Sequence, residues 1–238
     1  MGCMNRTTQP TALVTGASKG LGRALARSLA GRGWHVIVDA RSSTPLSAVA
    51  SELPSAVAVR GDVTDPAHRD ALAAAVRRHG SLDLLVNNAS DLGPSPLPTL
   101  GRYPLDALRA VYETDVVAPL ALTQLLLPDL RAANGIVVNV SSDAAVEAYP
   151  GWGGYGSAKA ALDQLGAVLA VEEPDLRVYA VDPGDMRTDM HQAAFPGEDI
   201  GDRPEPEAVV PAFLRLLDER PPSGRYRASD WAVAEVPL

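Results

Sequence analysis

Cysteine is nearly absent from this sequence: Cys3 is the one example in 238 residues, so no disulfide can form within the chain. That composition is typical of a reducing compartment, and we expect a cytoplasmic protein. The segment Met1 to Arg6 lacks the apolar core of a signal peptide, and no apolar run approaches the length of a transmembrane helix. We therefore expect residues 1–10 to be a flexible lead-in and the protein to have no membrane partner.

Positive charge is also scarce. The chain has 21 basic and 29 acidic residues and a net charge of −8, which argues against nucleic acid or an anionic membrane as the main partner. Two of the basic residues, Lys19 and Lys159, are lysines and the rest are arginines. A lysine kept in such a background can mark a place that needs a compact ammonium, although two residues do not exclude coincidence. We expect no metal site.

Apolar residues make up 46% of the chain, and their pattern alternates between short continuous runs and helical periodicity. The expected strands are Ala12–Thr15, His35–Asp39, Ala56–Val59, Leu82–Val86, Gly135–Val140, Leu176–Val181 and Gly224–Arg227. The expected helices are Leu21–Arg32, Leu46–Leu53, Pro66–Arg78, Leu105–Arg131, Tyr155–Val171 and Glu207–Glu219. Asp91–Pro104 and the stretch from Pro183 to Pro206 are expected as loops. The pattern predicts an α/β protein, one Rossmann-type doubly wound domain over 1–238 with helices on both faces of a parallel sheet.

A glycine-rich turn separates the first strand from the first helix. Glycines there let the backbone approach a pyrophosphate, and the helix N-terminus offers free N–H groups. A glycine cluster alone is equally typical of a tight turn, but its place between a strand and a helix favours dinucleotide binding. The residues that we expect at the cofactor are Gly16, Ser18, Lys19, Gly20, Leu21 and Gly22.

A second motif, Tyr155-x-x-x-Lys159, brings a phenol and an ammonium together if the segment is helical. A free phenol has a pKa of about 10. A neighbouring ammonium favours phenolate and lowers that pKa, so Tyr155 could exchange a proton with an alkoxide or alcohol. By itself this motif occurs often by chance. Two serines, Ser141 and Ser142, end the strand before it, and either could hold a substrate oxygen.

Together these motifs resemble, in order, those of the short-chain dehydrogenase/reductase family, over about Thr11 to Thr188. The resemblance favours Ser142, thirteen residues before Tyr155, as the residue that holds the substrate oxygen. It implies that Lys159 also binds the nicotinamide ribose. Further cofactor contacts that it implies are Asp62, Val63, Asn88, Ala89, Pro183, Gly184 and Thr188.

The family pattern also implies which dinucleotide binds. In NAD-dependent members the carboxylate that binds the ribose matches Ala40, one position after Asp39, and side chains alternate along a strand. Lys19 and Arg41 match the basic residues of NADP-dependent members. We therefore expect NADP(H) in preference to NAD(H), although Arg41 could also be a solvated arginine at a turn.

Two positions depart from the family pattern. Asp115 stands where the family has an asparagine that holds a water between the lysine and solvent, and Ser90 stands where it has a glycine. An ionised Asp115 accepts hydrogen bonds but cannot donate them, and its charge could offset the effect of Lys159 on Tyr155. Alternatively, Asp115 caps or kinks its helix. We still count it among the expected catalytic residues.

These observations predict an NADP-dependent carbonyl reductase or alcohol dehydrogenase, with Tyr155 as the general acid and base. The alternative, which Ser90 and Asp115 favour, is a dinucleotide-binding sensor or partner protein without turnover. The family pairs through helices matching Leu105–Arg131 and Tyr155–Val171, so we expect a homodimer or homotetramer. The segment 185–206 is expected to border the substrate. Residues that suggest a small apolar carbonyl or alcohol substrate, cyclic or polyketide-like, are Tyr149, Trp152, Met186, Met190 and Phe195.

Overall fold

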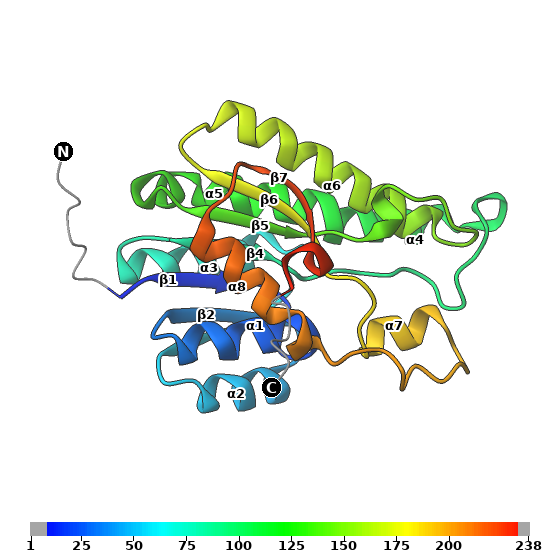
Figure 1. Cartoon of the computed structure of the whole chain (residues 1–238), viewed down its shortest axis with the longest axis horizontal. Helices are drawn as coiled ribbons and strands as arrows, with labels where there is room; N and C mark the ends of the chain where they lie inside the picture. The colour runs from blue at the N-terminus through cyan, green and yellow to red at the C-terminus, as the bar shows by residue number, and fades with distance from the viewer. Residues whose placement is uncertain (1–8, 233–238) are drawn as a thin grey trace.

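The computed structural model describes residues 9–232, and seven parallel strands form its centre (Figure 1). Their order, β3-β2-β1-β4-β5-β6-β7, confirms the expected Rossmann-type sheet. The strands are β1 (Thr11–Val14), β2 (His35–Ala40), β3 (Ala56–Arg60), β4 (Leu84–Asn87), β5 (Ile136–Val140), β6 (Arg177–Asp182) and β7 (Gly224–Arg227). Cys3 and most of the expected lead-in lie outside the described residues.

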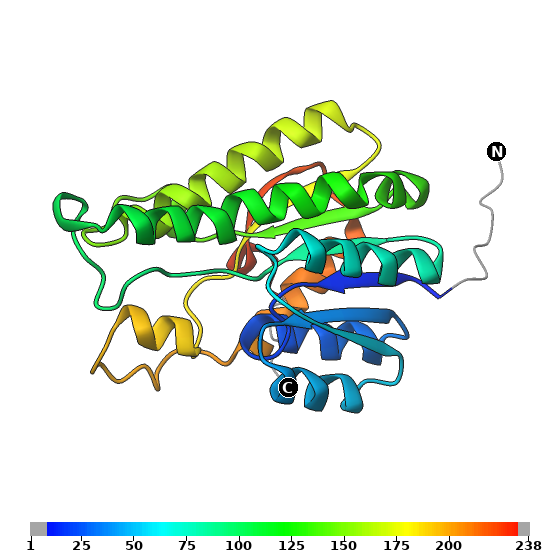
Figure 2. The same cartoon turned by 180° about the vertical axis from the view of Figure 1, so that it is seen from behind.

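Helices cover both faces of this sheet. One face carries α1 (Gly20–Gly31), α2 (Ser43–Glu52) and α8 (Val210–Glu219); the other carries α3 (Pro66–His79), α5 (Ala118–Ala133) and α6 (Gly153–Glu172) (Figures 1 and 2). Successive side chains of a strand point to opposite faces of the sheet: Ala12 and Val14 pack against α1, α2 and α8, and Leu13 packs on the face of α3, α5 and α6. Near-continuous apolar strands are thus buried from both sides.

The chain order reverses between β1 and β4, since β2 and β3 lie on one side of β1 and the later strands on the other. A crevice forms at such a point beyond the carboxyl ends of parallel strands. In Figure 1 this is the end toward which the β1 arrow points, and α7 (Asp189–Ala194) stands off the sheet there.

The expected long helix is continuous from Leu105 to Ala133, but a π turn at Glu113–Val117 separates α4 (Leu105–Tyr112) from α5. Pro119 explains the wider turn, because it has no N–H to donate to the carbonyl four residues earlier. By length and composition alone this 29-residue helix could cross a membrane, whereas from the sequence we expected no segment of transmembrane length. It lies along the sheet instead, with Leu122, Leu126 and Leu130 in the core.

The stretch after Pro183 corrects another expectation. It was expected to be loop as far as Pro206, but it contains the short helix α7. Thr188 caps that helix by accepting a hydrogen bond from the backbone N–H of His191. The last expected helix starts later than Glu207, because a short 3₁₀ turn at Pro206–Ala208 precedes α8.

Candidate active site

A cleft of about 890 Å³ opens at the carboxyl ends of the strands. The expected site residues that line it are Gly16, Ser18, Lys19, Gly20, Leu21, Arg41, Asp62, Val63, Asn88, Ala89, Ser142, Tyr155, Lys159, Pro183, Gly184 and Thr188. Two expected residues lie behind this lining. Gly22 packs under the glycine turn, and Asp115 is fully buried behind Lys159.

The glycine turn is held tightly against the end of β4. Gly16 has a φ of +64°, and a Cβ there would lie 2.9 Å from the Cα of Ala89, so both conformation and space require glycine. The Asn88 side-chain amide donates to the carbonyls of Thr15 and Gly16. The Thr15 hydroxyl in turn accepts the N–H groups of Asn88 and Ala89. Asn88 and Ala89 therefore fix the shape of the turn as well as lining the cleft.

Asp39, near the end of β2, lines the cleft but is only 1% exposed. One carboxylate oxygen accepts the Gly16 N–H at 2.7 Å, and the other lies 2.9 Å from Nε2 of His68. Burial raises the pKa of Asp39, and the bond to His68 opposes that shift. Both oxygens are thus engaged in supporting the turn, and the next two residues, Ala40 and Arg41, also line the cleft.

Lys19 makes an ion pair that the sequence did not suggest. Its Nζ lies 2.7 Å from a carboxylate oxygen of Asp189 at the start of α7, with both side chains largely exposed. The pair joins the glycine turn to the segment expected to border the substrate. Any cofactor phosphate that binds Lys19 must compete with Asp189.

The structure separates the two serines at the end of β5. Ser141 is buried, and its hydroxyl donates to the carboxylate of Asp163 on α6 at 2.8 Å. The Ser142 hydroxyl is only part-buried and donates to Asp143 at 2.9 Å. Both hydroxyls donate to a carboxylate and both serines line the cleft, so the two differ in burial, and Ser142 is the more accessible one.

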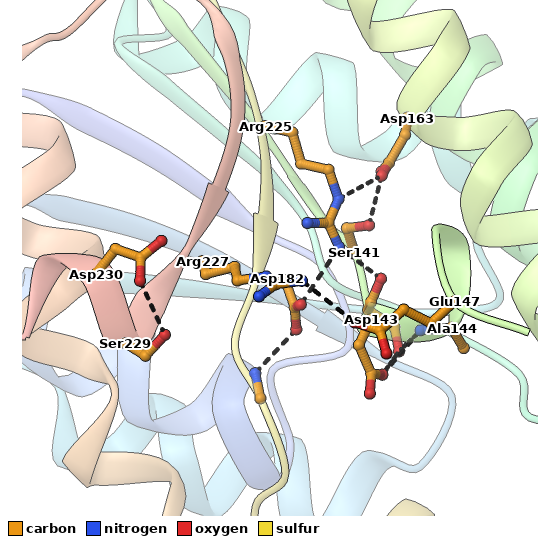
Figure 3. A network of polar contacts seen from close by, with 12 residues as sticks. Ser141, Asp143, Ala144, Glu147, Asp163, Asp182, Arg225, Arg227, Ser229 and Asp230 are labelled. Carbon is orange, nitrogen blue, oxygen red and sulfur yellow. Dashed lines mark hydrogen bonds and ion pairs between the residues drawn. The ribbon is translucent and has the colours of Figure 1, made fainter. Parts of the chain in front are cut away.

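Arg225 on β7 connects the end of β5 to α6 and β6 through hydrogen bonds, as Figure 3 shows. Its guanidinium donates to Asp163 at 3.2 Å, to the backbone carbonyl of Ser142 at 2.8 Å and to Asp182 at 3.3 Å. Sequence reasoning missed this residue. The one feature of the sequence that could have drawn attention to Arg225 is its place inside a short expected strand, beside strands that are apolar.

Tyr155 and Lys159 lie one turn apart on α6, and both are buried. The Lys159 Nζ sits 5.4 Å from the Tyr155 ring centroid and donates to the carbonyl of Val140 at 3.0 Å. Burial raises the pKa of the Tyr155 phenol above its ordinary value, and the charge of Asp115 raises it further. The pKa of Tyr155 is therefore raised in the protein alone, contrary to the lowering that we expected from Lys159.

Asp115 meets Ser90 in the structure. The Ser90 hydroxyl donates to one Asp115 carboxylate oxygen at 2.9 Å, and the Asp91 N–H donates to the other at 2.7 Å. Lys159 Nζ lies 3.9 Å from the oxygen that Ser90 contacts. Ser90 is also a side-chain hydrogen-bond partner of Tyr155, which favours phenolate. The two positions that depart from the family pattern are therefore in direct contact.

The outer part of the cleft is apolar and aromatic. Trp152 stacks edge-on with Tyr155 at 5.8 Å between ring centroids and lies 6.0 Å from Phe195. All five residues expected at the substrate, Tyr149, Trp152, Met186, Met190 and Phe195, line this part. Thr188 accepts a bond from the backbone of α7, so its O–H remains able to donate into the cleft.

Comparison with known proteins agrees with this geometry. A model of the short chain dehydrogenase family matches residues 10–199. An uncharacterised oxidoreductase of Saccharomyces cerevisiae is 36% identical over 182 residues, which cover 75% of this chain and 71% of the relative. Sepiapterin reductase of Xenopus tropicalis is 36% identical over 232 residues, 90% of this chain and 84% of the relative. A short chain dehydrogenase from Shigella flexneri, solved with NADP, superposes with a TM-score of 0.86 at 31% identity, covering 93% and 98% of the two chains. The chain belongs to the short-chain dehydrogenase family of oxidoreductases.

Proposed function

We propose that this protein is an NADP(H)-dependent carbonyl reductase or alcohol dehydrogenase in which Tyr155 is the general acid and base. The observation that carries the proposal is the convergence of Ser142, Tyr155 and Lys159 on one cleft, beyond a glycine turn built for close approach. A chain that had lost catalysis would have no reason to keep all three.

The residues of the cleft fit a nicotinamide dinucleotide. Gly16 allows the backbone to come close to a pyrophosphate, and the N-cap residue of α1, Lys19, makes no side-chain capping bond. Arg41 is exposed at the end of β2, where Asp39 is engaged with Gly16 and His68. A cation at this position favours the 2′-phosphate of NADP(H), although Asp62 also interacts with Arg41. The NADP-bound Shigella flexneri relative is consistent with this.

When bound, the cofactor supplies or accepts a hydride at its nicotinamide ring. The residues of this chain handle the proton and the oxygen. Ser142 donates a hydrogen bond to the substrate oxygen, and Tyr155 delivers its phenolic proton to that oxygen as negative charge develops. Lys159 holds positive charge beneath Tyr155 and orients the ring.

The aromatic and methionine wall of the outer cleft supports a small, largely apolar carbonyl or alcohol as the substrate, with a ring or polyketide-like chain. Trp152 and Phe195 offer flat faces on which a ring can stack. We further propose a cytoplasmic location, one domain spanning 1–238, and a substrate-bordering role for 185–206.

We also propose a homodimer or homotetramer that pairs through α5 and α6. Leu122 and Leu126 are buried in the hydrophobic core, so they are not interface residues. Val168 and Val171 on α6 are 44% and 81% exposed, and Val117 on the π turn before α5 is 46% exposed, which is apolar area that a partner would cover. Sedimentation should give a mass well above the monomer's 24.9 kDa.

A direct test follows NADPH consumption with a panel of cyclic and linear ketones. The proposal expects turnover with at least one class of ketone and less turnover with NADH. The alternative, a sensor that binds dinucleotide without turnover, expects saturable NADPH binding and no consumption with any ketone of the panel.

A further inference from the structure

The two departures from the family pattern, Ser90 and Asp115, form one connected feature. Asp115 lies on the π turn of the long helix, and Ser90 follows β4, 25 positions away in the sequence. The Ser90 hydroxyl donates to the Asp115 carboxylate at 2.9 Å and also contacts the Tyr155 phenol, whose pKa it lowers. Ser90 therefore lies between a buried carboxyl group and the proposed catalytic tyrosine.

The surroundings of Asp115 favour a group that can both hold and release a proton. Its side chain is fully buried, and burial raises its pKa. Lys159 from α6, the Asp91 N–H and the Ser90 hydroxyl oppose that shift. The Asp91 carboxylate adds to it. The remaining ionisable neighbours are the phenols of Tyr155 and Tyr103, whose pKa values the charge of Asp115 raises.

We propose that Asp115 stores a proton that refills Tyr155 through the hydroxyl of Ser90. This inference rests on the proposed function, in which Tyr155 is the acid that protonates the reduced carbonyl. It assigns Ser90 a direct part in proton transfer. It also replaces the water-linked route that the family asparagine implies with a route made of side chains.

The transfer balances within one reduction, and Asp115 must then take up a proton from solvent before the next. As hydride arrives at the carbonyl carbon, Tyr155 gives its hydroxyl proton to the alkoxide oxygen. The Ser90 proton passes to the phenolate oxygen while Ser90 takes the proton of the Asp115 carboxyl. One proton leaves Asp115 and one reaches the substrate, and Ser90 and Tyr155 end unchanged. The carboxylate left on Asp115 is stabilised by the Asp91 N–H and by Lys159 at 3.9 Å.

The family residues at these two positions could not complete the path. A hydroxyl donates and accepts at once, so Ser90 can reverse its hydrogen bond with Asp115 when the carboxyl is protonated. A glycine at position 90 has no proton to pass, and an asparagine at position 115 has no acidic proton to store. Helix capping does not account for the contact, since Asp115 reaches out of its own helix to Ser90 and Asp91.

The first test is a proton inventory of steady-state ketone reduction in mixtures of H₂O and D₂O. The wild type should give a curved inventory, because two or more protons move together. Ser90→Ala and Asp115→Asn should give linear inventories, and Ser90→Ala should lower kcat roughly 10- to 100-fold, at the lower end of proton-transfer effects. A linear inventory in the wild type, or a curved one in Ser90→Ala, would overturn the relay.

Matched controls remove a serine hydroxyl and an aspartate carboxylate at positions outside the proposed path. Ser157 lies on α6 close to Tyr155, but its hydroxyl donates to the Gly154 carbonyl. Asp106 is exposed on α4 and pairs with Arg109. Ser157→Ala and Asp106→Asn should keep the curved inventory and the wild-type kcat, which separates the relay from a general loss of folding.

A second readout does not depend on turnover. Infrared difference spectra at neutral pH should show a carboxylic acid C=O band in the wild type that is absent in Asp115→Asn and shifted in Ser90→Ala. Absence of any band that depends on Asp115 would overturn the proton store even in an active enzyme. A wild type that reduces no carbonyl would instead refute the proposed function, and the infrared result would still decide whether Asp115 holds a proton.

Discussion

Arg225 donates a hydrogen bond to the backbone carbonyl of Ser142 across 2.8 Å, although the two residues are 83 positions apart. The same guanidinium bonds Asp163 and Asp182, so it links β7, α6, β6 and the end of β5. The position of the Ser142 hydroxyl therefore depends on a strand that contributes no residue to the proposed chemistry.

Replacing Arg225 by methionine should reduce kcat about 10- to 100-fold, because small displacements of a positioning residue are costly in catalysis. It should also destabilise the fold by about 1.5–3 kcal/mol, typical of lost hydrogen bonds to charged groups, or roughly 3–12 °C in Tm. Arg227→Met is the matched control, since Arg227 lies on the same strand and pairs with the half-exposed Glu147. Equal losses in both variants would show that Arg225 acts only through general stability.

Tyr155→Phe should lower kcat by about 10²- to 10⁴-fold, the usual contribution of general acid catalysis. The dissociation constant for NADPH should stay within a few-fold, because the ring and its packing against Trp152 remain. Tyr226→Phe removes a hydroxyl that bonds the Pro222 carbonyl and should leave kcat unchanged. A Tyr155→Phe enzyme that keeps most of its ketone reduction would refute the proposed function.

Cofactor preference should depend on the end of β2. We expect NADPH to bind at least about tenfold tighter than NADH, equivalent to about 1.4 kcal/mol. The double change Ala40→Asp and Arg41→Ala should reverse this preference, because it adds a carboxylate for the ribose hydroxyl and removes a cation. Titration calorimetry with both cofactors measures the ratio, and similar dissociation constants in the wild type would contradict the prediction.

The Lys19–Asp189 ion pair should weaken NADPH binding slightly, because Lys19 must leave Asp189 to meet a phosphate. Exposed pairs contribute at most about 1 kcal/mol, so Asp189→Asn should tighten NADPH binding by up to about fivefold. The gain should shrink at high salt, since both side chains are exposed. Asp199→Asn, on the same segment, is the control that should leave the dissociation constant unchanged.

Local patterns predicted much of this structure. Continuous apolar runs located six of the seven strands to within about two residues, and the spacing of Tyr155 and Lys159 placed both on one helical face. The short helix α7 was missed because it lies in a segment rich in proline and glycine, where Thr188 provides its cap through a single hydroxyl. Periodicity cannot be recognised in six residues.

Contacts between distant segments were not predictable in the same way. Lys19 and Asp189 are 170 positions apart, and Ser90 and Asp115 meet only because β4 and the long helix lie against each other. Taken one at a time, Ser90 and Asp115 looked like separate departures that weakened the enzyme hypothesis. Their contact changes that interpretation, because the Ser90 hydroxyl can pass on a proton that the Asp115 carboxyl stores.

Asp115→Asn should move the pH dependence of both reaction directions to lower pH. In the protein alone, burial raises the pKa of Tyr155 and the charge of Asp115 raises it further. At a pH high enough for Asp115 to be ionised, removing its charge leaves the effect of burial and lowers the pKa of Tyr155 from its wild-type value. Alcohol oxidation needs phenolate, so the rising limb of its kcat/KM profile should shift to lower pH. Ketone reduction needs the phenol, so its falling limb should shift the same way.

Asp115→Leu serves as the contrasting variant, because it also removes the charge but loses the bonds to Ser90 and the Asp91 N–H. A purely electrostatic role predicts the same shift in both variants. If the hydrogen bonds also position Ser90, Asp115→Leu should lose kcat beyond the shift, since the buried partners are left unsatisfied. Identical pH profiles in the wild type and Asp115→Asn would show that no charge on Asp115 acts on Tyr155 over the pH range of these limbs.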